Sequence, residues 1–268
     1  MERKIEAVIF DWAGTLVDFG CLAPLKALQE AFSERKIEVA QQELRQYMGL
    51  PIREHVRAVL RMPEVRQRRK EVSLTDEEKE ERILTERTEE LLLASAAQYS
   101  VPKPYVKESL EELREAGIKI GSTTAYTEDI MDLVAEEAKK RGVWTDEWFC
   151  PECAGEKGRP YPYMLFRNLQ FLGVSGVDRV IKVGNTAADI QEGKRAGVLT
   201  VGILEGSSAM GLTADEFEDL SRESYEKECA RTERIFCEAG ADYVIANMKE
   251  LTDLIRRVES GDEEKISA

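Results

Sequence analysis

The sequence predicts an α/β protein, a doubly wound parallel sheet that carries an inserted all-helical domain. From about residue 102 onward, short apolar segments alternate with helical patterns, and such alternation builds parallel sheets with helices on both faces. The stretch from about 22 to 99 instead has helical periodicity and almost no strand pattern. We therefore predict a core domain of residues 1–20 and 100–268, with a helical cap domain of residues 21–99 inserted after the first strand.

The first predicted strand is the apolar, β-branched run that ends at Phe10. The run breaks at Asp11, and Gly14 and Thr15 follow as turn residues. Asp11 therefore lies at the carboxyl end of a strand, where open α/β sheets bind their ligands. A carboxylate in that place can act as a nucleophile. The plainer alternative is an aspartate that only ends the strand in a turn.

The next segment combines apolar residues at helical spacing with a densely charged stretch. Between residues 63 and 90, acidic and basic side chains often stand three or four apart, which is typical of a solvated helix face. Thr75 and Glu78 have the spacing of a capping box that opens a long helix toward Leu93. The apolar positions at helical spacing are Leu25, Leu28, Ala31, Phe32, Val56, Val59 and Leu60.

The remaining predicted elements alternate as a doubly wound sheet requires. Gly117 ends a helix around Leu110 and Leu113, and the chain has no evident internal repeat. Further strands are predicted at 118–124, 180–184, 199–204 and 241–245, and further helices at about 128–140, 190–196 and 248–258.

Composition and charge narrow the classes of function. The chain has 268 residues, of which 43% are hydrophobic and 34% charged, as in soluble globular proteins. No apolar run is long enough to span a bilayer, and no signal-peptide pattern precedes the first strand, so we expect a cytoplasmic protein without a membrane partner. A net charge of −14 argues against a nucleic-acid partner. A small anionic substrate is still possible, because a few cations in a cleft can bind it.

The five cysteines do not form the framework of a small secreted protein. Cys150 and Cys153 have the spacing of half a zinc site, but the matching second half is missing, and distant Cys229 and Cys237 would have to complete it. We therefore expect two loop thiols in a reducing cytoplasm rather than a zinc or redox centre.

Polar residues follow several of the predicted strands. Asp11 ends the first strand, Thr124 ends the strand at 118–124, and Asn185 and Asp189 come after the strand at 180–184. Arg159 adds a cation in a Gly-Arg-Pro-Tyr-Pro segment. Hydroxyl and backbone amide groups bind phosphate oxygens, and carboxylate and carbonyl oxygens suit Mg²⁺. Their order and their positions at strand ends together indicate a phosphate site.

With these residues in place, the chain resembles the haloacid dehalogenase superfamily of phosphotransferases, and within it the phosphonatases (phosphonoacetaldehyde hydrolases). The resemblance covers nearly the whole chain and implies a haloacid dehalogenase-like Rossmannoid core. Its most specific motifs are Asp-Trp-Ala-Gly-Thr at 11–15 and Gly-Arg-Pro-Tyr-Pro at 158–162. It also includes the segments 5–10, 48–50, 55–58, 118–124, 181–184 and 206–208.

The resemblance implies Mg²⁺-assisted hydrolysis in which Asp11 attacks phosphorus. The Asp11 carboxylate and the Ala13 carbonyl would hold the metal, Asn185 would supply a third ligand, and Asp189 would support these ligands. A homodimer formed through the cap is also implied.

The resemblance assigns further residues to the substrate. Thr124 and Arg159 would hold the phosphoryl group and stabilise its charge. His55, the only histidine, falls where the family has an active-site histidine in the cap; a structural role is the alternative. The implied substrate contacts are Thr15, Met48 and Tyr126.

Two departures from the family pattern bear on the chemistry. Phosphonatases use a cap lysine to form a Schiff base with the aldehyde, and the matching position here is Ile52. The neighbouring Arg53 stays protonated and cannot form an imine, and Lys26 is the nearest other amine in the sequence. Asn185 stands where the family has an aspartate. Its amide oxygen can still ligate Mg²⁺ but adds no charge, so metal affinity should fall.

Ala13 restricts the leaving group. It lies two residues after the nucleophile, where phosphomonoesterases of the superfamily carry an aspartate as general acid. Ala13 therefore suits a leaving group that needs no proton, such as an enolate, an enamine or the carboxylate of an acyl phosphate. Without the Schiff-base lysine, an enamine cannot form as the leaving group.

The favoured function is Mg²⁺-dependent, phosphonatase-like hydrolysis of a small phosphonate or phosphate. The alternatives are a phosphatase for an activated phosphate such as an acyl phosphate, and a phosphomonoesterase that uses another acid. A metal-free carbon–halogen hydrolase would show activity that EDTA does not inhibit. A non-catalytic phosphonate- or phosphate-binding homologue would bind its ligand without turnover.

Overall fold

The computed structural model describes residues 4–72 and 76–262. In these residues six parallel strands form one sheet, in the order β3-β2-β1-β4-β5-β6. Chain progression along the sheet reverses between β1 and β4, as in doubly wound folds. The predicted fold class is therefore confirmed. The strands are β1 (Ala7–Phe10), β2 (Lys119–Thr123), β3 (Glu147–Phe149), β4 (Val180–Gly184), β5 (Leu199–Ile203) and β6 (Tyr243–Ile245).

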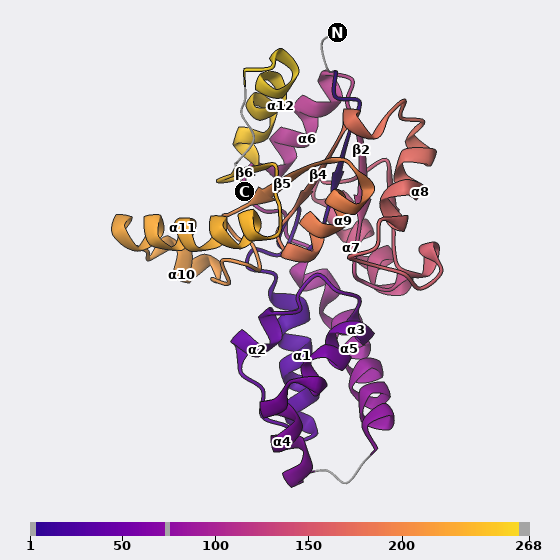
Figure 1. Ribbon diagram of the computed structural model, residues 1–268, viewed down its shortest axis with the longest axis vertical. Coiled ribbons are helices and arrows are strands. Elements are labelled where there is room, and N and C mark those ends of the chain that lie inside the picture. Colours follow the sequence, from indigo (N-terminus) through magenta and orange to yellow (C-terminus); the bar gives the residue numbers. More distant parts are fainter. Residues whose placement is uncertain (1–3, 73–75, 263–268) are drawn as a thin grey trace.

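Helices cover the sheet and build the insertion. Figure 1 shows α1 to α5 gathered at one end of the molecule, away from α6 and α12 at the other end. No helix of the described residues is long and apolar enough to cross a membrane. The helices are α1 (Leu22–Glu34), α2 (Gln41–Arg45), α3 (Ile52–Arg61), α4 (Pro63–Val72), α5 (Glu77–Tyr99), α6 (Val106–Glu115), α7 (Glu128–Lys140), α8 (Tyr163–Leu172), α9 (Ala187–Ala196), α10 (Ala214–Glu218), α11 (Arg222–Glu238) and α12 (Leu251–Ser260), with 3-10 turns η1 (Glu152–Ala154), η2 (Val177–Arg179) and η3 (Met248–Glu250).

The side chains of β1 alternate between the two faces of the sheet. Val8 and Phe10 belong to the large apolar core that includes residues of α6 and α12. Ala7 and Ile9 belong to a second core with Leu165 of α8. All four β1 residues are buried because helices cover both faces. This explains why the strand is an unbroken apolar run.

The helical insertion is joined to the sheet by two segments that pair with each other. Val17 and Pro102 form an antiparallel bridge, and the N–H of Asp18 donates to the carbonyl of Val101 at 3.1 Å. The Asp18 carboxylate also accepts a hydrogen bond from the N–H of Ala23, at 2.9 Å, in the first turn of α1. The chain therefore leaves the core and returns to it at one place.

The structure adds elements that the sequence analysis does not predict. Strand β3 has three residues, too few to show a period, and α8, α10 and α11 are also new. Helix α5 continues to Tyr99 rather than ending near Leu93. The predicted cap residue Thr75 lies outside the described residues. The described N-cap is Asp76, whose carboxylate accepts from the N–H of Glu78 at 3.2 Å.

Candidate active site

Strand ends bring the predicted polar residues to one edge of the sheet. Phe10 of β1 lies opposite Ser122 of β2 and Val183 of β4, so these strands end at nearly the same level. Asp11 and Asn185, which follow β1 and β4, meet there, with 2.6 Å between Asp11 Oδ2 and Asn185 Nδ2. This is also the place where the strand order reverses, and open α/β sheets bind ligands at such a place.

A cavity of about 40 Å³ lies at this edge, between the sheet and the helical insertion. A wider cleft of about 840 Å³ lies next to it and shares Met48, Leu50 and Thr186 with it. Thr15 and Asp189 do not line the cavity but lie behind its wall. The predicted site residues that do line it are Asp11, Ala13, Met48, His55, Thr124, Tyr126, Arg159 and Asn185.

Arg159 holds Asp11 at the cavity wall. Its Nη1 lies 2.7 Å from Asp11 Oδ1, and both residues are buried. Burial raises the pKa of Asp11, and the nearby Asp189 adds to this effect, whereas Arg159 opposes it. Burial acts to lower the pKa of Arg159, but the surrounding carboxylates outweigh it and raise that pKa. The cavity therefore contains a permanent cation beside a carboxylate.

Beneath this pair lies a buried charge network that includes Lys182 and Glu192, which the sequence analysis does not single out. Lys182 Nζ lies 3.2 Å from Asp189 Oδ1 and 3.3 Å from Glu192 Oε2. Arg159 Nε donates to Glu192 Oε2 at 3.1 Å. Burial acts to raise the pKa of Asp189, but Arg159 and Lys182 outweigh it and lower that pKa. The one signal in the sequence is a lysine within the apolar strand β4.

Asn185 presents its amide nitrogen, not its oxygen, to the expected metal position. Nδ2 donates to Asp11 Oδ2 at 2.6 Å, to the Ala13 carbonyl at 3.0 Å and to Thr15 Oγ1 at 3.0 Å. Oδ1, which was expected to ligate Mg²⁺, instead accepts from the N–H of Ser208 at 2.9 Å. An amide NH₂ group is a donor and offers no lone pair to a metal. As arranged, these residues do not fit Mg²⁺.

Thr124 and Tyr126 reach the cavity, whereas Thr15 does not. The Thr124 hydroxyl accepts from the N–H of Tyr126 at 3.1 Å, which leaves its own proton for a ligand oxygen. Tyr126 is buried, and burial raises the pKa of its hydroxyl well above the usual value. Thr15 is fully buried and donates to Asp11 Oδ2 at 3.3 Å. Thr15, expected to contact substrate, therefore supports Asp11 from behind.

His55 reaches the cavity from α3 as a neutral side chain. Its Nε2 lies 2.8 Å from the Leu44 carbonyl, so Nε2 carries the proton that is donated to this acceptor. Burial lowers the pKa of His55 to about 4, although the bond to Leu44 opposes this shift. With Nε2 committed to the backbone, Nδ1 is the nitrogen that can accept a proton.

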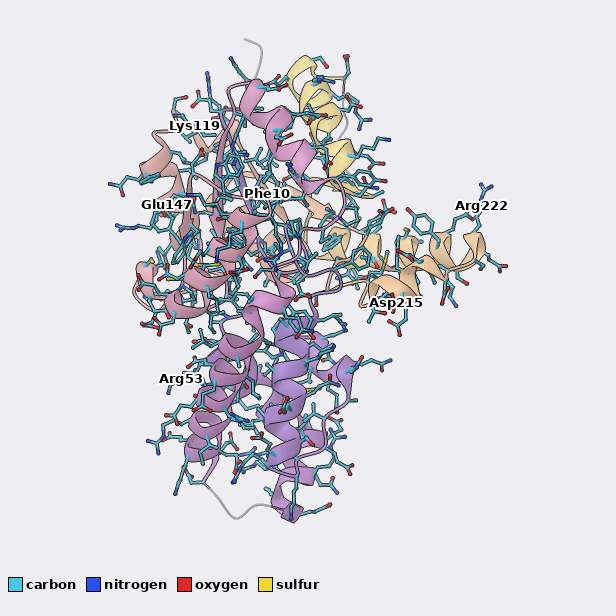
Figure 2. All side chains as sticks on the ribbon, turned by 180° about the vertical axis from the view of Figure 1, so that it is seen from behind. Phe10, Arg53, Lys119, Glu147, Asp215 and Arg222 are labelled. Carbon is cyan, nitrogen blue, oxygen red and sulfur yellow. The ribbon has the colours of Figure 1, made fainter. Side chains whose placement is uncertain are left out.

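Ile52 also lines the cavity, one helical turn before His55. The next residue, Arg53, points outward on the surface of the insertion (Figure 2), where it pairs with Glu81 at 2.9 Å. Lys26 is exposed and lies over the ring of Tyr99, 5.4 Å from its centroid. Among the described residues, no lysine lines this cavity.

Cys150 and Cys153 are free thiols whose sulfur atoms lie 3.0 Å apart. Burial raises the pKa of Cys150, and the hydrogen bond with Cys153 raises it further. Within residues 4–72 and 76–262, no three His, Cys, Asp or Glu side chains are grouped so that they could hold a metal ion.

The chain is similar to known hydrolases over most of its length. The family model for haloacid dehalogenase-like hydrolases matches residues 5–197. A phosphonoacetaldehyde hydrolase from Lysinibacillus sphaericus is 41% identical over 256 residues, which cover 95% of each chain. The phosphonoacetaldehyde hydrolase of Bacillus cytotoxicus is 42% identical and covers 96% of this chain and 97% of its own.

A solved structure is also similar to this chain over nearly its whole length. The crystal structure of a phosphonoacetaldehyde hydrolase like protein from Oleispira antarctica superposes with a TM-score of 0.91 at 33% identity. The alignment covers 98% of this chain and 96% of that one. The similarity therefore includes both the sheet and the helical insertion.

Proposed function

Because the chain belongs to the haloacid dehalogenase-like hydrolase family and is phosphonatase-like, we propose that it cleaves a phosphoryl bond with Asp11 as nucleophile. The observation that carries the proposal is the position of Asp11 Oδ1, 2.7 Å from a buried Arg159 at the wall of the cavity. The fixed cation attracts a phosphoryl group to the nucleophile and stabilises the charge of the transition state.

The proposed reaction has two displacements at phosphorus. Asp11 Oδ1 forms a bond to phosphorus while the bond to the leaving group breaks, and the leaving group takes the electron pair. Water then attacks the aspartyl-phosphate, releases phosphate and regenerates the carboxylate. Arg159 Nη1 and the Thr124 hydroxyl bind the phosphoryl oxygens during both steps, while Asn185 and Thr15 keep Asp11 Oδ2 in place.

We propose an activated phosphonate, of the phosphonoacetaldehyde kind, as the first substrate class. The names of the relatives support this class. Ile52 and Ala13 at the cavity wall support a second one, an acyl phosphate, because they offer neither an amine for an imine nor an acid for an alkoxide. Both classes have leaving groups that depart without a proton from the enzyme.

Phosphate release from phosphonoacetaldehyde, acetyl phosphate and a simple alkyl phosphate tests the proposal. We expect the wild type to release phosphate from one or both of the first two substrates, and Asp11→Asn to lose that activity while it still folds. If Asp11→Asn still releases phosphate, Asp11 is not the nucleophile. Phosphate binding without release from any substrate would favour the non-catalytic homologue.

The homodimer implied by the resemblance stays a prediction. Light scattering on the purified chain measures its molar mass in solution and so distinguishes a monomer from a dimer. A dimer that disappears when charges are introduced on the outer faces of α4 and α5 would assign the contact to the cap.

A further inference from the structure

We propose that the side-chain amide of Asn185 takes the place of a divalent cation in this site. Hydrolases of this family generally use Mg²⁺. In this chain the amide supports the nucleophile instead, and the site binds Mg²⁺ weakly. This inference rests on the proposed function in one respect, because it takes Asp11 to be the nucleophile that needs support.

The position of the amide nitrogen is the first argument. Three oxygens converge on Asn185 Nδ2, from Asp11 at 2.6 Å, the Ala13 carbonyl at 3.0 Å and Thr15 at 3.0 Å. The Asp11 and Ala13 oxygens are the two that the resemblance assigns to the metal. An NH₂ group carries partial positive charge on its protons. It therefore stabilises the Asp11 carboxylate from the place where the cation would stand.

The orientation of the amide is fixed by its other contacts. Asn185 Oδ1 accepts from the N–H of Ser208 at 2.9 Å, and the backbone N–H of Asn185 donates to Asp189 Oδ2 at 3.3 Å. If the amide turned over, its NH₂ group would face the Ser208 N–H, and its oxygen would face the carboxylate of Asp11. Asn185 is only 1% exposed, so water would not replace the lost hydrogen bonds.

The backbone leaves the amide no room to swing aside. Gly14 has a positive φ of 85°, and its backbone lies close against the Asn185 side chain. A Cβ atom at Gly14 would lie 2.4 Å from Asn185 Oδ1. The loop after β1 therefore encloses the amide closely.

The charge of the site agrees with this geometry. Asp11 lies in a buried cluster with Arg159, Lys182, Asp189 and Glu192, two cations and three carboxylates with one net negative charge. An aspartate in place of the amide would give two negative charges, which a divalent cation would neutralise. With the amide, a bound Mg²⁺ would leave a buried net positive charge, which is unfavourable.

Calorimetric titration of the full-length chain with MgCl₂ tests the proposal. The variants are Asn185→Ala, which removes the amide, and Asn185→Asp, which supplies a ligand oxygen. Gln191→Glu is the matched control, because it adds a carboxylate at an exposed position of the neighbouring helix α9. If the amide occupies the cation position, Asn185→Ala binds Mg²⁺ as well as the wild type or better. Asn185→Asp binds it roughly tenfold more tightly or more, since affinity rises with ligand charge, and Gln191→Glu resembles the wild type.

Two results would overturn the proposal. Weaker Mg²⁺ binding by Asn185→Ala than by the wild type would show that the amide oxygen is a ligand. Wild-type binding as tight as that of Asn185→Asp would show that the amide does not block the site. If Asn185→Ala does not fold, the melting temperatures of the wild type and of Asn185→Asp are compared with Mg²⁺ and with EDTA. We expect Mg²⁺ to raise the melting temperature of Asn185→Asp but not that of the wild type. An equal rise in the wild type would contradict the proposal. None of these measurements needs turnover, so a failure of the proposed hydrolysis would be seen separately.

Discussion

Arg159 Nη1 lies 2.7 Å from Asp11 Oδ1, in a place where both side chains are almost fully buried. The proposed nucleophile and the proposed phosphoryl-binding cation are thus paired before any substrate arrives. Arg159 Nε is committed to Glu192, and Nη2 donates to the Thr123 carbonyl at 2.7 Å. Nη1 pairs with Asp11 and, at 3.2 Å, with Asp189, so a phosphoryl oxygen bound beside Asp11 would share Nη1 with these carboxylates.

Removing this cation should damage both stability and activity. We expect Arg159→Ala to lower the free energy of unfolding by about 3 to 5 kcal/mol, because it leaves buried carboxylates without their partner. Arg159→Lys should recover part of the stability but not the turnover, because a lysine cannot span the same set of acceptors. Urea denaturation and phosphate release measure the two effects. Arg256→Ala, which breaks an exposed pair with Asp253, is the control and should cost less than about 1 kcal/mol.

Ile52→Lys should introduce imine chemistry into the cavity. Position 52 lines the cavity, so the new amine would meet an aldehyde bound beside Asp11, and burial would keep part of it unprotonated. Borohydride with phosphonoacetaldehyde should then trap a covalent adduct, which mass spectrometry detects. Arg53→Lys is the matched control, because it places a lysine one residue away, on the exposed side of α3. An adduct in the wild type would show that another lysine acts.

Ala13→Asp should widen the range of leaving groups. Ala13 lines the cavity two residues after Asp11, so a carboxylic acid there could protonate a departing alkoxide. General acids contribute about 10²- to 10⁴-fold, and we expect the rate on an alkyl phosphate to rise by up to about 100-fold relative to acetyl phosphate. Ala13→Ser adds polarity without an acid and should leave this ratio unchanged. An equal gain in both variants would contradict the role of proton donation.

Two buried groups should give opposite dependences of stability on pH. The pKa of His55 is lowered by burial to about 4. Between pH 4 and 6.5 the unfolded chain therefore binds more protons at this residue, and folding becomes more favourable as pH rises. Burial raises the pKa of Asp18 from 3.8 to about 6. Between these pH values the folded chain binds more protons at Asp18, so folding becomes less favourable as pH rises from 3.8 to 6. Each effect is about 3 kcal/mol at most.

Unfolding experiments from pH 4 to pH 7 separate the two effects. His55→Gln keeps a donor for the Leu44 carbonyl but does not titrate, so its stability should fall with rising pH relative to the wild type. Asp18→Asn should show the reverse. Profiles of both variants that run parallel to that of the wild type would refute the assignment.

The sequence predicts the part of the site that depends on strand ends. Asp11, Thr124 and Asn185 each come at the end of a predicted strand or directly after it, and parallel strands bring their ends to one edge. Lys182 and Glu192 cannot be predicted in this way. A lysine inside a buried strand is explained only by its carboxylate partners on α9, and their positions are known only from the structure. Likewise, the amide orientation of Asn185 depends on the N–H of Ser208, on a different loop.

Two local features of the structure could not be predicted from the sequence, the short strand β3 and the direction of the Thr15 side chain. Strand β3 has only three residues, Glu147–Phe149, all partly buried, which is too short a segment to show the period of a strand. Thr15 looks like a substrate ligand because it stands close to Asp11 in the motif. The turn after β1 directs it inward instead, where its hydroxyl bonds to Asp11.

The bridge between Val17 and Pro102 has a consequence for how this molecule can be altered. Since the two connections already lie side by side, a short turn could close the core where the helices now begin, without moving β1 or β2. The helical insertion thus enters and leaves the sheet domain at a single junction, although α1, α3 and α5 share one apolar core with the sheet and α5 packs against α7. The ion pairs of Arg159 with Asp11, Asp189 and Glu192 are all made by residues outside the insertion, so the insertion covers the nucleophile while the sheet domain holds it in place.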